Sequence, residues 1–231
     1  MEPSLPAITH VIFDVDGLLL NTESLYTQTT ERVVGQFGKQ FTWELKLQQM
    51  GKKGSEAAAD IVRSLDLPLT PEEYLEQSGR IWQQLFPTTE LMPGAERLVR
   101  HLHRHGVPMA LASGGGAPAF KLKTSRHGAL FALFTHAVLA STEPEVTNGK
   151  PAPDVYQVAA RRFAVPPARP ENVLTFEDAP NGVLSARAAG MPCIMVPDPR
   201  MPEEMTRPAT LVLTSLEHFR PEDFGLPPFE A

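Results

Sequence analysis

Short apolar runs recur along the chain, and turn-forming or polar residues bound each of them. Runs of this kind are typical of buried strands, above all where they contain β-branched residues. The first run ends abruptly in Asp-Val-Asp-Gly. We expect strands at Thr9–Phe13, Val107–Ala112, Ala137–Leu139, Val173–Phe176 and Cys193–Val196, and an added edge strand at Thr210–Leu213.

Apolar residues between several of these runs recur at helical spacing. A glycine, Gly106 or Gly190, follows two of the helical patterns and is typical of a helix C-terminus. This pattern predicts helices at Ala95–His105, Asp154–Phe163 and Asn181–Ala189. Buried strands that alternate with helices predict an α/β fold with a parallel, doubly wound sheet.

The alternation stops between about residues 23 and 91, where we find helical patterns and no convincing strand. The expected helices there are Ser24–Phe37, Trp43–Met50, Ser55–Leu65 and Pro71–Leu85. The sequence therefore predicts a core domain of residues 1–20 and 92–231, and a helical domain of residues 21–91 inserted after the first strand.

Composition narrows the class of protein. The chain has 231 residues, of which 42% are hydrophobic, so it can bury a sizeable core. Its formal net charge of −6, without a basic block, gives no support for binding a nucleic-acid polymer or a membrane surface. No apolar run could span a bilayer, and the start of the chain lacks a signal-peptide pattern. The single cysteine, Cys193, excludes an internal disulfide and favours a reducing, cytoplasmic location.

The strongest candidate site is Asp14-Val15-Asp16-Gly17, at the end of the first expected strand. In open α/β sheets, ligands bind beyond the carboxyl ends of the strands. Two carboxylates so close together would repel each other, and a hard divalent cation with oxygen ligands fits there. We expect Asp14 to attack phosphorus and Asp16 to move a proton to and from the leaving group. The competing interpretation is an exposed Asp-Gly turn.

Three further motifs point to the same chemistry. Ser113 and Gly114 follow a strand, where a hydroxyl and accessible backbone N–H groups suit a phosphate, although a helix cap uses the same residues. Lys150 precedes a helix and would neutralise charge on a transferring phosphoryl group, although most lysines are solvated. At the fourth strand's end, we expect Asp178 to be a direct metal ligand and Glu177 a direct or water-mediated one. Acids that favour a helix N-terminus are the alternative.

In this order, the four motifs resemble those of the haloacid dehalogenase superfamily, and the resemblance covers nearly the whole chain. The inserted helices are similar to those of its C1-cap members, which include β-phosphoglucomutase and many small-molecule phosphatases. The resemblance implies a Rossmann-like core, an inserted cap domain that closes over the substrate, Mg²⁺ and an aspartyl-phosphate intermediate.

The same resemblance assigns roles to the motif residues. Asp14 is implied to be the nucleophile and a metal ligand, and Asp16 the general acid/base, whose backbone carbonyl also binds the metal. Ser113 and Lys150 are implied to hold phosphate, and Asp178 completes the metal site.

Two more particular strings, Lys123–His127 and Phe224–Pro227, resemble the subgroup that hydrolyses pseudouridine 5′-phosphate. This implies a small phosphorylated metabolite as the partner, with pseudouridine 5′-phosphate favoured, and we expect a monomer. The chain departs from the pattern at Asn21, where the superfamily usually has Asp, and at Ser113-Gly114-Gly115, where close relatives carry Thr-Ser-Ser. These departures bear on substrate identity more than on the reaction.

A loop between two expected helices, Gly51-Lys52-Lys53-Gly54, stands at the position of the family's substrate-specificity loop. Lys52 and Lys53 are therefore candidate contacts to substrate oxygens once the cap closes. A solvated basic loop is the equal alternative for Lys53.

Other functions remain open at this point. A sugar-phosphate phosphatase or a β-phosphoglucomutase-like phosphomutase would use the same aspartyl phosphate. A non-catalytic phosphate-ligand-binding protein has the Asn21 and Ser113 departures as its only support. A dehalogenase needs no Mg²⁺, and the acids of the metal site argue against it.

Overall fold

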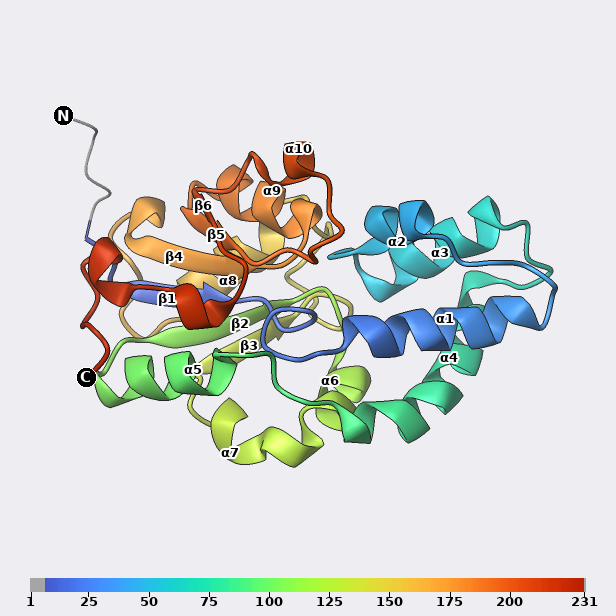
Figure 1. Cartoon of the computed structure of the whole chain (residues 1–231), viewed down its shortest axis with the longest axis horizontal. Helices are drawn as coiled ribbons and strands as arrows, with labels where there is room; N and C mark the ends of the chain where they lie inside the picture. Colours follow the sequence, from blue (N-terminus) through green and yellow to red (C-terminus); the bar gives the residue numbers. More distant parts are fainter. Residues whose placement is uncertain (1–6, 231) are drawn as a thin grey trace.

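The computed structural model describes residues 7–230; the first six residues and Ala231 lie outside the described part. Part of the predicted core domain and of the segment examined for a signal peptide therefore falls on residues that are not described. Within residues 7–230, six strands form one sheet in the order β3-β2-β1-β4-β5-β6, and all neighbours pair in parallel (Figure 1). The strands are β1 (His10–Phe13), β2 (Met109–Ser113), β3 (His136–Leu139), β4 (Val173–Glu177), β5 (Cys193–Met195) and β6 (Leu211–Val212).

Helices cover both faces of this sheet. Successive side chains along a strand point to opposite faces, so those of β1 enter two different hydrophobic clusters. Val11 and Phe13 of β1 belong to the hydrophobic cluster that includes α5 (Ala95–Arg104) and α7 (Gly128–Phe131). Ile12 between them belongs to a second cluster. That second cluster includes residues of α8 (Asp154–Arg161) and α9 (Pro180–Ala188). The α/β, doubly wound fold is confirmed, and its strand order is that of a Rossmann-like sheet.

Four helices follow β1 and lie together beyond the carboxyl ends of the strands (Figure 1). They are α1 (Glu23–Gly35), α2 (Trp43–Gln49), α3 (Gly54–Ser64) and α4 (Pro71–Leu85). We call these helices with their connecting loops the helical layer. The layer has a hydrophobic cluster of its own, with buried residues that include Val33, Ile61 and Tyr74.

The chain enters and leaves the helical layer at neighbouring points. Leu20 and Leu91 form an antiparallel bridge, Asn21 N donates to Glu90 O at 2.9 Å, and Met92 N donates to Leu19 O at 2.9 Å. Both connections therefore run side by side.

The remaining helices are short. They are α6 (Ala117–Lys123) and α10 (Glu203–Thr206), with 3₁₀ turns η1 (Phe86–Thr88), η2 (Ser125–His127), η3 (Pro170–Asn172), η4 (Leu216–His218) and η5 (Pro221–Phe224). Across residues 7–230, none of the helices has the length and hydropathy that a bilayer crossing requires. The expected strands and helices are found with ends displaced by at most two residues, and the expected edge strand is β6.

Candidate active site

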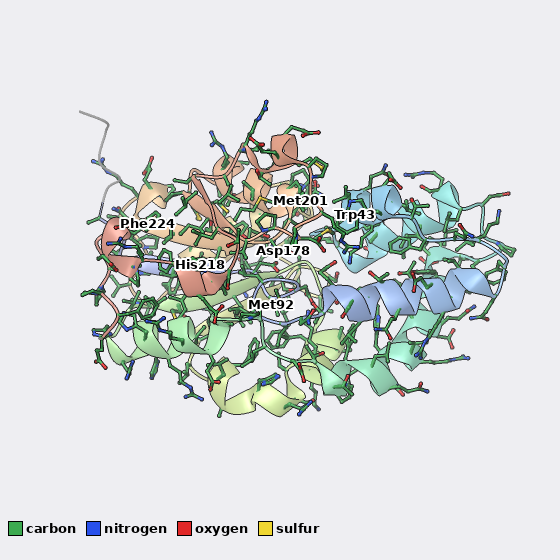
Figure 2. The ribbon with its side chains drawn as sticks, viewed as in Figure 1. Trp43, Met92, Asp178, Met201, His218 and Phe224 are labelled. Carbon is green, nitrogen blue, oxygen red and sulfur yellow. The ribbon has the colours of Figure 1, made fainter. Side chains whose placement is uncertain are left out.

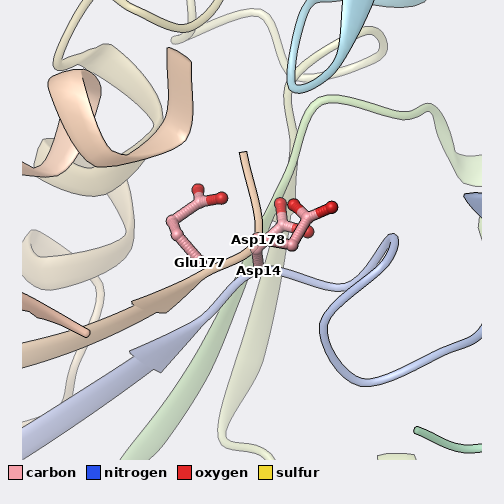
Figure 3. Close-up of side chains that lie close together, drawn as sticks. All are labelled: Asp14, Glu177 and Asp178. Atoms are coloured by element: carbon pink, nitrogen blue, oxygen red, sulfur yellow. The ribbon is translucent and has the colours of Figure 1, made fainter. Parts of the chain in front are cut away.

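The predicted acids meet at the carboxyl edge of the sheet. Asp14 directly follows β1, Glu177 ends the neighbouring strand β4, and Asp178 comes next. Each of the three offers a carboxylate oxygen, and these oxygens lie within 4.8 Å of one another (Figure 3). Figure 2 places Asp178 between the sheet and the helical layer. Parallel pairing of β1 and β4 thus brings together acids that are far apart in sequence.

Lys150 joins two of these acids from the loop before α8. Its Nζ lies 2.6 Å from Asp14 Oδ1, 2.6 Å from Glu177 Oε1 and 3.0 Å from Ala112 O. These three acceptors match the three donors of an ammonium group. The Lys150 side chain is fully buried, so its charge is balanced by the carboxylates and not by water.

Lys150 is one positive charge among several buried carboxylates, and the pKa values of Asp14 and Asp178 are raised. Burial raises the pKa of Asp14 from 3.8 to about 7; Lys150 opposes the rise, while repulsion by Glu177 and Asp16 adds to it. Burial likewise raises the pKa of Asp178 well above 3.8, with further repulsion from Glu23 and Asp14. Burial alone would lower the pKa of Lys150, but the two carboxylates outweigh it and the net pKa is raised. The site therefore has a deficit of positive charge.

A divalent cation fits this deficit. Hard cations such as Mg²⁺ take oxygen ligands, and carboxylates are what this edge offers. Glu177 Oε2 is buried without a hydrogen-bond partner among the described residues, while Glu177 Oε1 accepts from Lys150 and from the Tyr156 hydroxyl. One oxygen of Glu177 is thus left for a metal or for a water bound to it.

Asp16 lies beside this cluster and is held by other residues. Thr22 Oγ1 donates to Asp16 Oδ1 at 2.9 Å, and Ser113 Oγ donates to Asp16 Oδ2 at 3.1 Å. Lys123 Nζ, from the end of α6, also donates to Asp16 Oδ2. The Ser113 hydroxyl, which we expected to hold phosphate, donates to Asp16 in this structure, and it accepts from Gly115 N at 3.1 Å.

Gly114 lies where the helical layer touches the core. A Cβ at this position would lie 2.6 Å from Lys52 O and 2.9 Å from Gly51 O, which is closer than real Cβ contacts. A glycine is therefore required for this close approach between the Gly51–Lys52 backbone and the loop after β2.

The two lysines of the loop before α3 have different partners. Lys52 Nζ donates to Asp60 Oδ2 at 2.6 Å, within the helical layer. Lys52 also lines a cavity between the sheet edge and the helical layer. Lys53 Nζ instead donates to Val146 O at 2.6 Å and Thr147 O at 2.9 Å, on the core. In this structure Lys53 therefore connects the helical layer to the core.

A cavity of about 730 Å³ lies between the sheet edge and the helical layer. Asp14, Asp16 and Asp178 line it from the sheet, and Tyr26 and Trp82 line it from the helices. Its volume lies in the range of roughly 300–1,000 Å³ that is typical of small-molecule sites. Trp82 stacks on Phe86 with centroids 5.3 Å apart, so its ring is fixed by packing.

Sequence reasoning gave no role to four residues that shape this site. Lys123 and Thr22 hold Asp16, Tyr156 binds Glu177, and the buried Lys46 pairs with Glu23 at 3.0 Å in the cavity wall. A signal for Tyr156 existed, because it follows the Lys150 motif by six residues on the helix that faces the sheet.

Comparisons with known proteins agree with this geometry. A family model described as haloacid dehalogenase-like hydrolase matches residues 8–190. A probable pseudouridine-5′-phosphatase of Drosophila melanogaster is 51% identical over 97% of this chain and 97% of that protein. The (DL)-glycerol-3-phosphatase 2 of Arabidopsis thaliana is 49% identical over 97% of this chain and 94% of that protein.

Among solved structures, CbbY from Rhodobacter sphaeroides in complex with phosphate superposes with a TM-score of 0.77 at 26% identity, covering 91% of this chain and 96% of that chain. A β-phosphoglucomutase from Clostridium difficile, at 19% identity and a TM-score of 0.76, shares the fold over 94% of this chain and 97% of that chain. Sequence family, fold and the acid cluster lead to the same result: the chain belongs to the haloacid dehalogenase-like hydrolases and is an enzyme of their phosphatase type.

Proposed function

We propose that this chain hydrolyses a small phosphate monoester with the help of Mg²⁺ and through an aspartyl phosphate on Asp14. One observation carries the proposal. The Asp14 carboxylate lines the cavity, lies within 4.8 Å of Glu177 and Asp178 oxygens, and is bound by a fully buried lysine. The proposed nucleophile lines the cavity together with Asp178, and Lys150 and Glu177 lie directly behind it.

The reaction has two balanced steps. First, a carboxylate oxygen of Asp14 bonds to phosphorus, the phosphorus–oxygen bond to the leaving group breaks, and Asp16 gives that oxygen a proton. Second, water bonds to phosphorus, Asp16 takes its proton, and the bond from phosphorus to Asp14 breaks. Lys150 balances the charge of Asp14 and of the phosphoryl group in both steps, and Ser113 and the backbone N–H of Gly114 are the further phosphate contacts.

Mg²⁺, when bound, would neutralise the phosphate oxygens so that an anionic carboxylate can approach them. Asp14, Asp178 and the backbone carbonyl of Asp16 would hold it, with Glu177 as a direct or water-mediated ligand. The donor set favours a hard cation, because all of these ligands are oxygens.

We propose residues 1–20 and 92–231 as the catalytic core and residues 21–91 as a cap that closes over the substrate. Support comes from the separate hydrophobic cluster of the helical layer and from the paired connections at Leu20 and Leu91. Closure would exclude all water but the attacking molecule. Lys52, which lines the cavity, remains the cap-loop candidate for a substrate contact. Lys53 would reach the substrate only if it left its carbonyl partners on the core.

Pseudouridine 5′-phosphate is the favoured substrate. The Drosophila relative is named for it, and the cavity has room and aromatic walls for a nucleoside. Glycerol 3-phosphate is the second candidate, because a relative of nearly equal identity is named for its hydrolysis. A sugar-phosphate phosphatase or a phosphomutase would share Asp14. We further propose that the protein acts as a monomer in the cytoplasm; the free, buried Cys193 is compatible with a reducing compartment.

The test is a phosphate-release assay over nucleoside, sugar and glycerol monophosphates, with Mg²⁺ and with chelator. We expect release from pseudouridine 5′-phosphate that needs Mg²⁺ and no bisphosphate primer. Asp14→Asn is the control that must be inactive. Turnover by Asp14→Asn, or undiminished turnover in chelator, would overturn the mechanism, whereas preference for another ester would change the substrate alone. Binding of esters without turnover would show a non-catalytic protein.

A further inference from the structure

Three donors from separate parts of the chain hold the carboxylate of Asp16. Thr22 Oγ1 binds Oδ1 from the segment that enters α1, whereas Ser113 Oγ binds Oδ2 from the end of β2. Lys123 Nζ binds Oδ2 from the end of α6, 107 residues away in sequence. With both oxygens bound, the carboxylate is held in one orientation.

Lys123 contacts Asp16 but does not itself line the cavity. The Lys123 side chain is 0% exposed, whereas that of Asp16 is 17% exposed and lines the cavity. Lys121, two residues earlier on α6, is exposed. A buried ammonium group is costly unless it is paired, so the pairing with Asp16 explains why this lysine points inward.

Gly115 leaves the space in which these polar groups meet. A Cβ at Gly115 would lie 3.4 Å from Lys123 Nζ, 3.4 Å from Ser113 Oγ and 3.9 Å from Asp16 Oδ2. A longer side chain placed in that direction would crowd the three groups. The loop after β2 and the end of α6 are thus built around the contact between Lys123 and Asp16.

We propose that Lys123 is a positioning residue that holds the carboxylate of Asp16 toward the cavity and influences the reaction only through Asp16. This inference rests on the proposed function, in which Asp16 transfers the proton. A positioned acid contributes about 10²–10⁴-fold to such a reaction, and small misplacements lose much of that gain. A lysine that merely anchors α6 would affect all substrates alike.

Substrates whose leaving groups differ in their need for a proton distinguish a residue that positions Asp16 from one that only anchors α6. An alkyl ester releases an alkoxide that needs a proton, whereas p-nitrophenyl phosphate releases a stable anion that needs little help. For Lys123→Met, we expect kcat/KM to fall about 10- to 100-fold with the better of pseudouridine 5′-phosphate and glycerol 3-phosphate. With p-nitrophenyl phosphate we expect a fall of about threefold or less, and KM for the alkyl ester should stay within about twofold.

The controls identify which claim fails. The ratio of kcat/KM for two substrates on one preparation does not depend on the folded fraction, and Lys123→Gln repeats the measurement with a less drastic change. Lys121→Met, on the exposed side of α6, should leave the ratio unchanged. In an Asp16→Asn background, Lys123→Met should cause no further loss.

Equal losses on both esters for Lys123→Met and Lys123→Gln, or a further loss in the Asp16→Asn background, would overturn the positioning role. If Asp16→Asn itself shows no dependence on the leaving group, the proposed acid/base role of Asp16 fails instead.

Discussion

The carboxyl edge of the sheet and the helical layer above it are held in different ways. At the sheet edge, Asp14, Glu177 and Lys150 are buried and joined by ion pairs of 2.6 Å. The helical layer contacts the core through α4, η1 and its loops, which include Lys53 on two carbonyls and Gly54 N on Ser141 Oγ at 3.0 Å. The proposed bond-making chemistry would thus lie on the buried, ion-paired wall of the cavity, and the proposed cap forms the opposite wall.

The largest expected effect comes from removing the nucleophile at the rigid edge. We expect Asp14→Asn to lower kcat by at least about 10⁴-fold, because a carboxamide lacks the anionic oxygen that would bond to phosphorus. Steady-state kinetics with a saturating ester measure the loss. A smaller loss would mean that the sheet edge does not carry the covalent step.

Lys150→Met tests whether the sheet edge depends on its buried charge balance. We expect kcat/KM to fall about 10²–10³-fold and the free energy of unfolding to fall by about 3 kcal/mol, because two buried carboxylates lose their cation. Urea unfolding and kinetics measure the two effects. Lys39→Met, at an exposed position of the helical layer, is the matched control and should change neither. An unchanged unfolding free energy for Lys150→Met would contradict the charge balance.

The raised pKa of Asp14 predicts how the metal-free protein responds to pH. Its pKa is about 7 in the folded state and 3.8 as the ordinary value, so between these pH values the folded state holds a proton that the unfolded state has lost. The contribution of Asp14 to stability in chelator should therefore fall as pH rises from about 4 to about 7, and then level off.

The comparison with Asp14→Asn isolates this contribution to stability. Between pH 5 and pH 7.5 in chelator, we expect the Tm of the wild-type chain to drop by about 3–6 °C more than that of the variant. Mg²⁺ should raise the wild-type Tm more at pH 7.5 than at pH 5, because cation and proton compete for the same oxygens. Thermal melts followed by circular dichroism test both, and parallel curves for the two proteins would contradict the prediction.

The smallest expected effect lies at the contact between the helical layer and the core. Lys53→Met removes hydrogen bonds to Val146 O and Thr147 O. We expect KM to rise about three- to tenfold with kcat within twofold, because closure is weakened while the sheet edge is intact. Lys39→Met again serves as the control. A fall in kcat/KM as large as that expected for Lys150→Met, caused by a lower kcat, would remove the distinction between the two regions.

The sequence predicted the acid cluster because its residues stand at the ends of strands that pair in the sheet. Asp14 and Glu177-Asp178 stand at the ends of strands whose apolar runs are plain, so their meeting at one edge could be predicted. Lys123 could not be assigned in this way. It ends a helix of seven residues, and the Lys123–His127 string to which it belongs assigned no role to it. The apolar pattern of this short helix does not predict that Lys123 is buried while Lys121 is exposed.

The loop lysines show a second limit of sequence reasoning. Lys52 and Lys53 are adjacent in a basic loop, and both were candidate contacts to substrate oxygens, with a solvated loop as the equal alternative for Lys53. The backbone directs them to different partners, Asp60 in the helical layer for one and core carbonyls for the other. Which partner each lysine takes depends on how the loop packs against the core. The residue types in the loop alone do not predict that packing.

The bridge between Leu20 and Leu91 has an evolutionary consequence. Since the insertion starts and finishes at the same spot, its sequence can be rewritten, or the whole piece exchanged, without altering the register of β1 and β2. Selection can then vary the inserted helices, which form one side of the cavity, separately from the strand ends that form the other side. Such modular change offers a route by which two proteins about half identical to this chain have come to be named for esters as unlike as a nucleotide and glycerol phosphate.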